Sequence, residues 1–299
     1  MPAMLDYKLI EALAAVVQEG GFEKAAKALY ITQSAISQRV KLLEDQTGQI
    51  LLARGTPPRA TPYGLKMLKH YLQVKRLEDD LAGEMNENAD PGFSSLAIGV
   101  NADSLATWFV DAIRPFLLEK RVVLDIRVDD QEQTHRLLRD GEVVGCLSTQ
   151  EQPMQGCRVD YLGCMNYRLM AAREFAAAWF PNGLTEPDVL KAPAVIFNRK
   201  DELHHRFLRQ VLGKTLGPIP IFYVPSSEKF VDFIASGLAY GLLPDQQISP
   251  SDRKSRMIDL VPNSHARVKL YWHCWNLKSP LLEDLTQYLG QSAKKLLEE

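Results

Sequence analysis

Two short helical patterns follow each other with almost no connection between them, and this arrangement constrains the fold more than any other feature. The second helix is predicted to begin immediately after Tyr30-Ile31, because the Thr32 hydroxyl can accept a hydrogen bond from a free backbone N–H at a helix start. The first helix has apolar residues at i, i+3, i+4 and i+7, the spacing of one helix face: Phe22, Ala25, Ala26 and Leu29. The sequence therefore predicts two helices joined by a tight turn.

The second of these helices combines a buried face with an unusual polar face. Ile36, Val40 and Leu43 recur at helical spacing and would pack inward. Small polar side chains of this kind can reach base edges and phosphates in the major groove of DNA, and a helix–turn–helix presents its second helix to that groove. A plain solvent-exposed face on a small helical bundle is the other interpretation that the helix leaves open. The residues concerned are Thr32, Gln33, Ser34, Ser37, Gln38, Arg39 and Lys41.

The segment after this helix predicts a short β-hairpin and then a long helix. An apolar run, 50–52, leads to a Gly-Thr-Pro-Pro tip with Arg54 before it and Arg59 after it. A wing of this kind places two arginines where they can neutralise phosphates or enter the minor groove. Thr61 and Pro62 suit the cap and first position of the long helix that follows.

The long helix carries an apolar stripe that little other chain is available to cover. The stripe favours pairing with a second copy of the chain, with packing inside one chain as the alternative. Turn-forming residues at 86–92 end the helix and predict a linker. The stripe consists of Met67, Tyr71, Val74, Leu77, Leu81 and Met85.

The C-terminal two thirds of the chain predict an α/β fold. Apolar runs at 95–100, 122–128 and 143–148 look like buried strands, and the segments between them have helical patterns. Such alternation indicates a parallel sheet with covering helices. The pattern resumes after residue 166, and two α/β lobes fit the whole better than one sheet.

Composition and motifs exclude several classes of function. The net charge is -2, no apolar run reaches the length of a membrane span, and the N-terminus lacks a signal-peptide pattern, so we expect a cytoplasmic protein. The four cysteines form no CxxC pair, and we expect buried thiols. His204 and His205 would diverge on a helix, which makes them a poor metal pair, and they are expected at the surface or at a contact between lobes. Without a phosphate loop, nucleophile elbow or metal motif, the sequence predicts no enzyme, cofactor or metal.

The stretch "FEKAAKALYITQSAISQRVKLLEDQTGQILLARG", together with "TPYG", resembles the LysR-type transcriptional regulators. The resemblance implies a winged helix–turn–helix domain at 1–61, a dimerisation helix and hinge at 62–91, and an effector domain at 92–299 like a periplasmic binding protein. Lobe I would hold about 92–163 and 268–299, and lobe II about 164–267. Within the family the chain most resembles the ArgP subgroup, also called IciA or LysG, through "VNADSLATW", "GEVVG", "WFPNG", "VLKAP", "PSSEKF" and "LYWH".

Polar residues at the predicted strand ends are candidates for effector binding, because ligands of open α/β sheets lie at the carboxyl ends of strands. Serines could hold a carboxylate and aspartates an ammonium or guanidinium group. Helix capping is the alternative for each serine, and a solvated strand end is the alternative for each acid. With the subgroup resemblance, these residues predict a basic amino acid as effector, lysine or arginine. The candidates are Asn101, Asp103, Ser104, Asp129, Asp130, Ser148, Asp201, Ser226 and Ser227.

The resemblance also implies partners and a mode of action. A dimer or tetramer would bind an interrupted dyad in double-stranded DNA, contact RNA polymerase, and activate genes of basic amino-acid export or metabolism. A replication-origin or chromosome-organising protein without gene-specific activation is the alternative that the sequence leaves open. An amino-acid-handling enzyme with a DNA-binding appendage is disfavoured, because the sequence offers no catalytic cluster.

Overall fold

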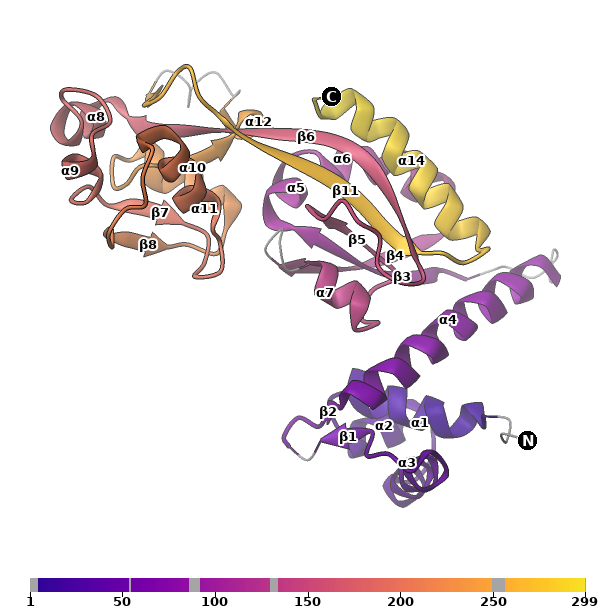
Figure 1. The fold of residues 1–299 in the computed structure, drawn as a ribbon. Coiled ribbons are helices and arrows are strands. Elements are labelled where there is room, and N and C mark those ends of the chain that lie inside the picture. The colour runs from indigo at the N-terminus through magenta and orange to yellow at the C-terminus, as the bar shows by residue number, and fades with distance from the viewer. Residues whose placement is uncertain (1–4, 54, 86–91, 130–133, 249–255, 299) are drawn as a thin grey trace. The chain divides into compact units, whose positions relative to one another are not determined.

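The computed structural model describes residues 5–53, 55–85, 92–129, 134–248 and 256–298 of the 299-residue chain. Two of the candidate residues, Arg54 and Asp130, lie outside these ranges. The chain divides into two compact units (Figure 1). One unit holds residues 1–92, 137–142 and 277–282, and the other holds residues 93–136, 143–276 and 283–299.

Three helices form the core of the N-terminal unit: α1 (Tyr7–Gln18), α2 (Phe22–Ala28) and α3 (Gln33–Thr47). The prediction that Thr32 caps α3 is confirmed, because its hydroxyl accepts a hydrogen bond of 3.2 Å from the backbone N–H of Ala35. Ile36, Val40 and Leu43 are buried in the core that α1 and α2 share with α3. Packing of this apolar face fixes which side of α3 is left to solvent.

The wing is tied to both neighbouring helices. Strands β1 (Leu52–Ala53) and β2 (Arg59–Ala60) pair antiparallel. The Glu44 carboxylate on α3 accepts hydrogen bonds from the backbone N–H groups of Leu51 and Leu52, at 2.7 and 3.2 Å. The Thr61 hydroxyl donates to the carbonyl oxygen of Ile50 at 2.7 Å. These bonds hold the hairpin at one end of α3.

Helix α4 (Pro62–Met85) begins where the sequence predicted. The Thr61 hydroxyl accepts a hydrogen bond from the backbone N–H of Gly64, and a Cβ at position 64 would lie 2.1 Å from the carbonyl oxygen of Leu51. Only glycine fits at this contact between the helix and the wing. Along the apolar stripe, Met67 and Tyr71 pack on the three-helix core. The later members, Leu77, Leu81 and Met85, are 40%, 55% and 75% exposed.

The second unit is built on a seven-stranded sheet in the order β10-β6-β11-β5-β3-β4, with β9 also pairing with β6. Parallel pairing joins β3 to both β4 and β5, and a separate parallel pair joins β7 to β8. The strands are β3 (Ser94–Asn101), β4 (Val122–Asp129), β5 (Gly145–Ser148), β6 (Cys157–Ala172), β7 (Ala194–Ile196), β8 (Ile221–Tyr223), β9 (Gly241–Pro244), β10 (Met257–Asp259) and β11 (Ala266–Trp275).

Helices accompany both lobes of this unit (Figure 1). One lobe holds β3 to β5 with α5 and α6, and the other holds β7 to β9 with α8 to α12. The helices are α5 (Ala102–Thr107), α6 (Phe109–Glu119), α7 (Thr134–Arg139), α8 (Arg173–Trp179), α9 (Glu186–Val189), α10 (Leu203–Leu212), α11 (Ser227–Ala235), α12 (Asp245–Ile248) and α14 (Pro280–Leu296). No helix of the described residues is long and apolar enough to cross a membrane.

The two lobes share the long strands β6 and β11, which run from one lobe into the other (Figure 1). These strands pair antiparallel from Ala266–Tyr167 to Trp275–Cys157, with a register shift between Leu270 and Tyr271. The predicted two-lobed α/β domain is confirmed, and the family resemblance also implied crossings between the lobes near Gly163 and Arg267, which lie in β6 and β11. A single sheet connects the two lobes. Apolar runs alone do not reveal this, because a strand that continues through a lobe boundary has the same pattern as two shorter strands.

Glu44→Ala is expected to destabilise the N-terminal unit by about 1.5–3 kcal/mol, because two backbone N–H groups lose a charged acceptor. Chemical denaturation of the full-length protein, followed by hydrogen exchange of the wing amides, would measure the loss. Asp45→Ala is the matched control, since Asp45 is an exposed acid on the same helix. Equal effects of the two substitutions would show that Glu44 does not hold the wing.

Candidate functional site

The polar residues that the sequence singled out for DNA lie along α3 and at its N-cap, most of them away from the buried face of Ile36, Val40 and Leu43. Thr32, Gln33, Ser34, Ser37, Gln38 and Lys41 are exposed, and Arg39 is half-buried; we call these seven residues the reader face. Arg59, on β2 of the wing, is also exposed. Hydroxyl, amide and basic side chains on one helix can donate and accept hydrogen bonds at base edges and phosphates.

The tight turn before α3 contains a residue that sequence reasoning passed over. Tyr30 has a φ of 54°, a left-handed conformation that few residues other than glycine adopt, and its side chain is 96% exposed. The conformation lets the chain reverse within two residues and begin α3 at once. The sequence shows that the connection between the two helices is short, but it does not show that Tyr30 adopts this conformation.

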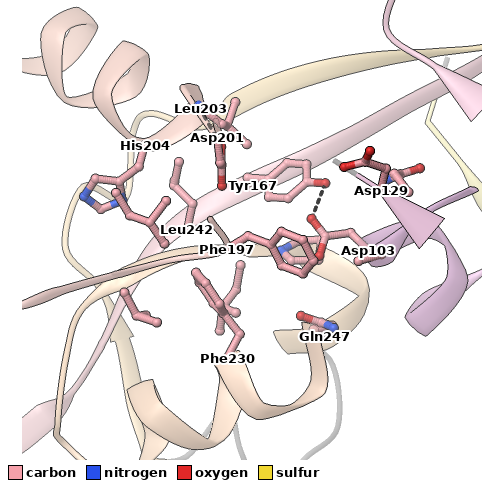
Figure 2. A pocket seen from close by; sticks show the side chains of 16 residues that line it. Asp103, Asp129, Tyr167, Phe197, Asp201, Leu203, His204, Phe230, Leu242 and Gln247 are labelled. Carbon is pink, nitrogen blue, oxygen red and sulfur yellow. Dashed lines mark hydrogen bonds between the residues drawn. The ribbon is translucent and has the colours of Figure 1, made fainter. Parts of the chain in front are cut away.

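A pocket lies within the second unit (Figure 2). Asn101 ends β3, and Asp103 lies in the first turn of α5, which follows it. Asp129 ends β4 beside Asn101, since these two residues are partners in the parallel register. The other lobe contributes most of the remaining lining, and Tyr167 comes from the shared strand β6. Its lining residues are Asn101, Ala102, Asp103, Asp129, Tyr167, Val195, Ile196, Phe197, Asp201, Leu203, His204, Phe230, Leu242, Leu243, Pro244 and Gln247.

Four of the nine candidate effector residues line this pocket: Asn101, Asp103, Asp129 and Asp201. The candidate serines lie outside the lining. Ser104 is buried with its hydroxyl 3.7 Å from the Met165 sulfur, and the Ser148 hydroxyl accepts a hydrogen bond from the backbone N–H of Gln150. Ser226 caps α11. The structure thus brings the predicted acids together with Asn101 and separates them from these hydroxyls.

Asp103 is the centre of a hydrogen-bonded group that joins the lobes. Its carboxylate accepts a hydrogen bond of 2.9 Å from the Tyr167 hydroxyl (Figure 2) and one of 2.7 Å from the Ser227 hydroxyl at the start of α11. The Gln247 amide on α12 donates to the Ser227 oxygen at 2.8 Å. Burial raises the pKa of Asp103 above its usual range, and these two hydrogen bonds to the carboxylate partly oppose that shift.

His204 is buried at the pocket. The sequence left a surface position or a contact between the lobes open for it, and the imidazole is 2% exposed and lines the pocket to which both lobes contribute. Burial lowers the pKa of His204 to about 3, with a smaller contribution from His205, so the ring is neutral near pH 7. Neither ring nitrogen has a hydrogen-bond partner among the described residues. The centroid of the imidazole ring lies 5.4 Å from the ring centroid of Tyr240. Helical spacing could not show this contact, because Tyr240 is distant in the sequence.

Sequence reasoning also missed the aromatic and amide residues of the pocket. Tyr167, Phe197 and Phe230 come from strand, loop and helix segments whose pattern is that of ordinary core residues, and Gln247 lies in a one-turn helix. Only the tertiary fold brings them to the predicted acids. The result is a pocket with three carboxyl groups, apolar walls and no lysine or arginine among its described lining residues.

The carboxyl groups and aromatic rings of the pocket can bind an organic cation. Ammonium and guanidinium groups form strong, short hydrogen bonds with carboxylates, and aromatic faces attract cations. Among the residues that the structure describes, no cluster of three His, Cys, Asp or Glu side chains could hold a metal ion.

Burial raises the pKa of the Cys146 thiol, which keeps that sulfur protonated.

Two family descriptions match the chain. Residues 7–65 match the bacterial regulatory helix-turn-helix protein of the lysR family, and residues 91–294 match the LysR substrate binding domain. The chain belongs to the LysR family of transcriptional regulators. The resemblance that the helix–turn–helix stretch carried is thereby confirmed, and with it a regulator that binds DNA and has an effector-binding domain.

Relatives of this LysR-type regulator are similar over almost its whole length. The HTH-type transcriptional regulator ArgP of Aeromonas salmonicida is 44% identical over 294 residues, which cover 98% of each chain. ArgP of Pseudomonas aeruginosa strain UCBPP-PA14 is also 44% identical, over 96% of this chain and 95% of that one. Both are named transcriptional regulators, so the names do not favour the replication-origin alternative.

Solved structures agree with the fold. ArgP from Mycobacterium tuberculosis has a TM-score of 0.88 at 37% identity and covers 99% of both chains. Full-length LysG from Corynebacterium glutamicum with bound effector Arg has a TM-score of 0.79 at 30% identity, covering 99% of this chain and 100% of that one. These structures confirm a two-lobed α/β effector domain that follows a helix–turn–helix domain in the sequence.

Replacing Gln38 and Arg59 is expected to separate two kinds of DNA contact. Gln38→Ala should relax specificity at particular base pairs, with a cost of about 1–3 kcal/mol on the preferred sequence. Arg59→Ala should weaken binding to all sequences alike and lower the slope of log affinity against log salt by about one. Binding titrations on variant operators at several salt concentrations would measure both. Wild-type behaviour of both variants would contradict the assignment of the reader face and wing.

Proposed function

We propose that this LysR-type regulator senses a basic amino acid, arginine or lysine, in the pocket and controls genes of basic amino-acid export or metabolism. The observation that carries the proposal is the meeting of Asp103, Asp129 and Asp201 in one pocket without a lysine or arginine in its described lining. The ArgP name of the relatives and the arginine bound to LysG support this choice of ligand class.

The pocket offers suitable contacts for both parts of such a ligand. Its ammonium or guanidinium groups would pair with the aspartates, and a partly buried pair of this kind is stronger than one in water. Its aliphatic stem would lie against Phe197, Phe230 and Tyr167, whose rings line the same space. Neutral and acidic amino acids lack a second cation and should bind poorly.

The proposed response begins at Asp103. A cation that approaches this carboxylate would compete with the hydroxyls of Tyr167 and Ser227, which come from the shared strand and the other lobe. A ligand with different affinity for two lobe arrangements shifts their populations. We propose that the shift alters DNA geometry or contact with RNA polymerase.

Assembly on DNA would use the long helix. We propose that residues 1–61 bind DNA, residues 62–91 pair two copies through α4, and residues 92–299 bind the effector and join dimers into tetramers. Two reader faces would then meet the half-sites of an interrupted dyad. The exposed row of Leu77, Leu81 and Met85 supports the pairing, because large apolar side chains on a solvent face favour burial against a partner.

Calorimetric titration of the full-length protein with arginine, lysine, norleucine and glutamate tests the ligand class. Binding of arginine or lysine alone is expected, and Asp129→Asn should weaken it by at least about tenfold, since one charged pair is lost. Asp111→Asn is the control, because Asp111 is an exposed acid on α6 outside the pocket lining. Absence of binding by both basic amino acids would contradict the proposal.

The raised pKa of Asp103 predicts a pH dependence of the same binding. Burial makes the folded protein hold this proton to a higher pH than a free carboxyl does, and a cation prefers the ionised form. Affinity for arginine should therefore rise with pH through the raised pKa and then level off, by no more than about tenfold per pH unit for one proton. Asp103→Asn should flatten the profile. A profile that falls with rising pH would contradict this account.

Leu81→Glu is expected to break the dimer by placing a charge in the middle of the exposed apolar row of α4. Analytical ultracentrifugation over a range of protein concentrations would detect the change as a shift toward monomer. Asp79→Ala is the control, since Asp79 is exposed on the opposite side of the same helix. If Leu81→Glu leaves the assembly unchanged, as the control is expected to do, α4 does not carry the pairing.

A further inference from the structure

Tyr30, in the turn before α3, has the most exposed large hydrophobic side chain among the residues that the structure describes, at 96%. Its ring therefore adds almost nothing to the core of the N-terminal unit. The residues on either side of it, Leu29 and Ile31, do pack against that core. The side chain of Tyr30 is thus left in solvent by a turn whose other large residues are packed.

The backbone conformation of Tyr30 is unfavourable for a residue of its size. Its φ of 54° lies in the left-handed region, where a Cβ is disfavoured and glycine is not. A bulky residue held there costs the fold free energy, and burial of the ring does not offset that cost. Because such strained positions cluster at binding sites, Tyr30 is a candidate for a contact outside the fold.

The turn holds Tyr30 next to the reader face. Only two peptide units separate it from Thr32, the N-cap of α3, so their Cα atoms lie no more than about 7 Å apart. The backbone N–H of Tyr30 donates to the carbonyl oxygen of Lys27 at 3.3 Å. The backbone N–H of Ile31 donates to that of Ala26 at 3.0 Å. An exposed tyrosine is therefore fixed beside the start of the helix that carries the reader face.

The chemistry of a tyrosine at this place favours a DNA phosphate over a base. Tyrosine hydroxyls are among the groups that donate to phosphate oxygens, and such contacts set the register of a protein on the duplex. Base edges are read by side chains of the helix inside the groove, and Tyr30 precedes that helix. The phosphates border the groove, where a residue just outside α3 can reach them.

We propose that the Tyr30 hydroxyl donates a hydrogen bond to a phosphate at the edge of the groove that α3 enters, and so positions the reader face. The inference rests on the proposed binding of DNA by residues 1–61 and adds a contact without base specificity. Because tyrosine is uncharged, the contact releases no counterion, which distinguishes it from the contact expected of Arg59.

Tyr30→Phe tests the contact, because it removes the hydroxyl and keeps the ring. The full-length variant is titrated at several salt concentrations with a duplex that the wild-type protein selects in vitro, and with single-base variants of that duplex. Affinity should fall about tenfold for every duplex, since a bond to a charged acceptor is lost, while the slope of log affinity against log salt stays the same. Tyr223→Phe is the matched control, because Tyr223 is an exposed tyrosine on β8 of the other unit.

Two results of this titration would overturn the proposal. One is wild-type affinity of Tyr30→Phe for every duplex at every salt concentration. The other is a loss confined to particular base pairs, which would make Tyr30 a base reader. In either case a loss of specificity in Gln38→Ala would leave the assignment of the reader face standing.

Neutral phosphates identify the partner of the hydroxyl. Each phosphate of the selected duplex is replaced in turn by a methylphosphonate, and both wild-type protein and Tyr30→Phe are titrated. One position in each half-site should weaken the wild type while leaving Tyr30→Phe with no further loss, because the same contact is then removed twice. Additive losses at every phosphate would contradict the proposal.

Tyr30→Gly is expected to change stability and DNA affinity independently. Glycine adopts a φ of 54° without strain, so thermal unfolding should occur at no lower temperature than in the wild type. DNA affinity should fall at least as much as in Tyr30→Phe. A lower unfolding temperature would show that the ring supports the fold, and wild-type DNA affinity with impaired transcription in vitro would assign it to a protein partner. Either result would overturn the proposal.

Discussion

The half-buried carboxylate of Asp103 makes the hydrogen bonds on which the effector domain depends. It stands at the start of α5 in one lobe and accepts hydrogen bonds from Tyr167 on the shared strand and Ser227 in the other lobe. A carboxyl group that is partly withdrawn from water needs such partners, and desolvation still shifts the pKa of Asp103 upward. Asp103 therefore takes part in the contact between the lobes, in the charge of the pocket and in its lining.

The DNA-binding half depends on a different kind of constraint. An apolar face on α3 packs against α1 and α2, which directs the reader face outward, while Glu44 and Thr61 fasten the wing to the neighbouring helices. Gly64 permits the close contact between wing and α4. Helix packing sets the orientation of the reader face, and a few hydrogen bonds set the position of the wing.

Local chemistry made the N-terminal features predictable from sequence. The Thr32 cap, the buried face of α3 and the start of α4 each depend on residues close together in the chain. The acids at the ends of β3 and β4 were also predictable, because parallel strands end at one edge. Tyr167, Phe197 and the buried His204 were not, since their neighbours come from distant segments. The family resemblance implied that the chain crosses between the lobes near Gly163 and Arg267, and these residues lie in the shared strands β6 and β11.

A crystal structure of the full-length protein with bound arginine tests the central claim most directly. The account predicts a cationic nitrogen of the ligand within about 3 Å of the Asp103 carboxylate, with the hydrogen bond from Ser227 lengthened or replaced. An arginine bound elsewhere, or one in this pocket with Asp103 still held by Ser227 and out of reach of the ligand, would contradict the account.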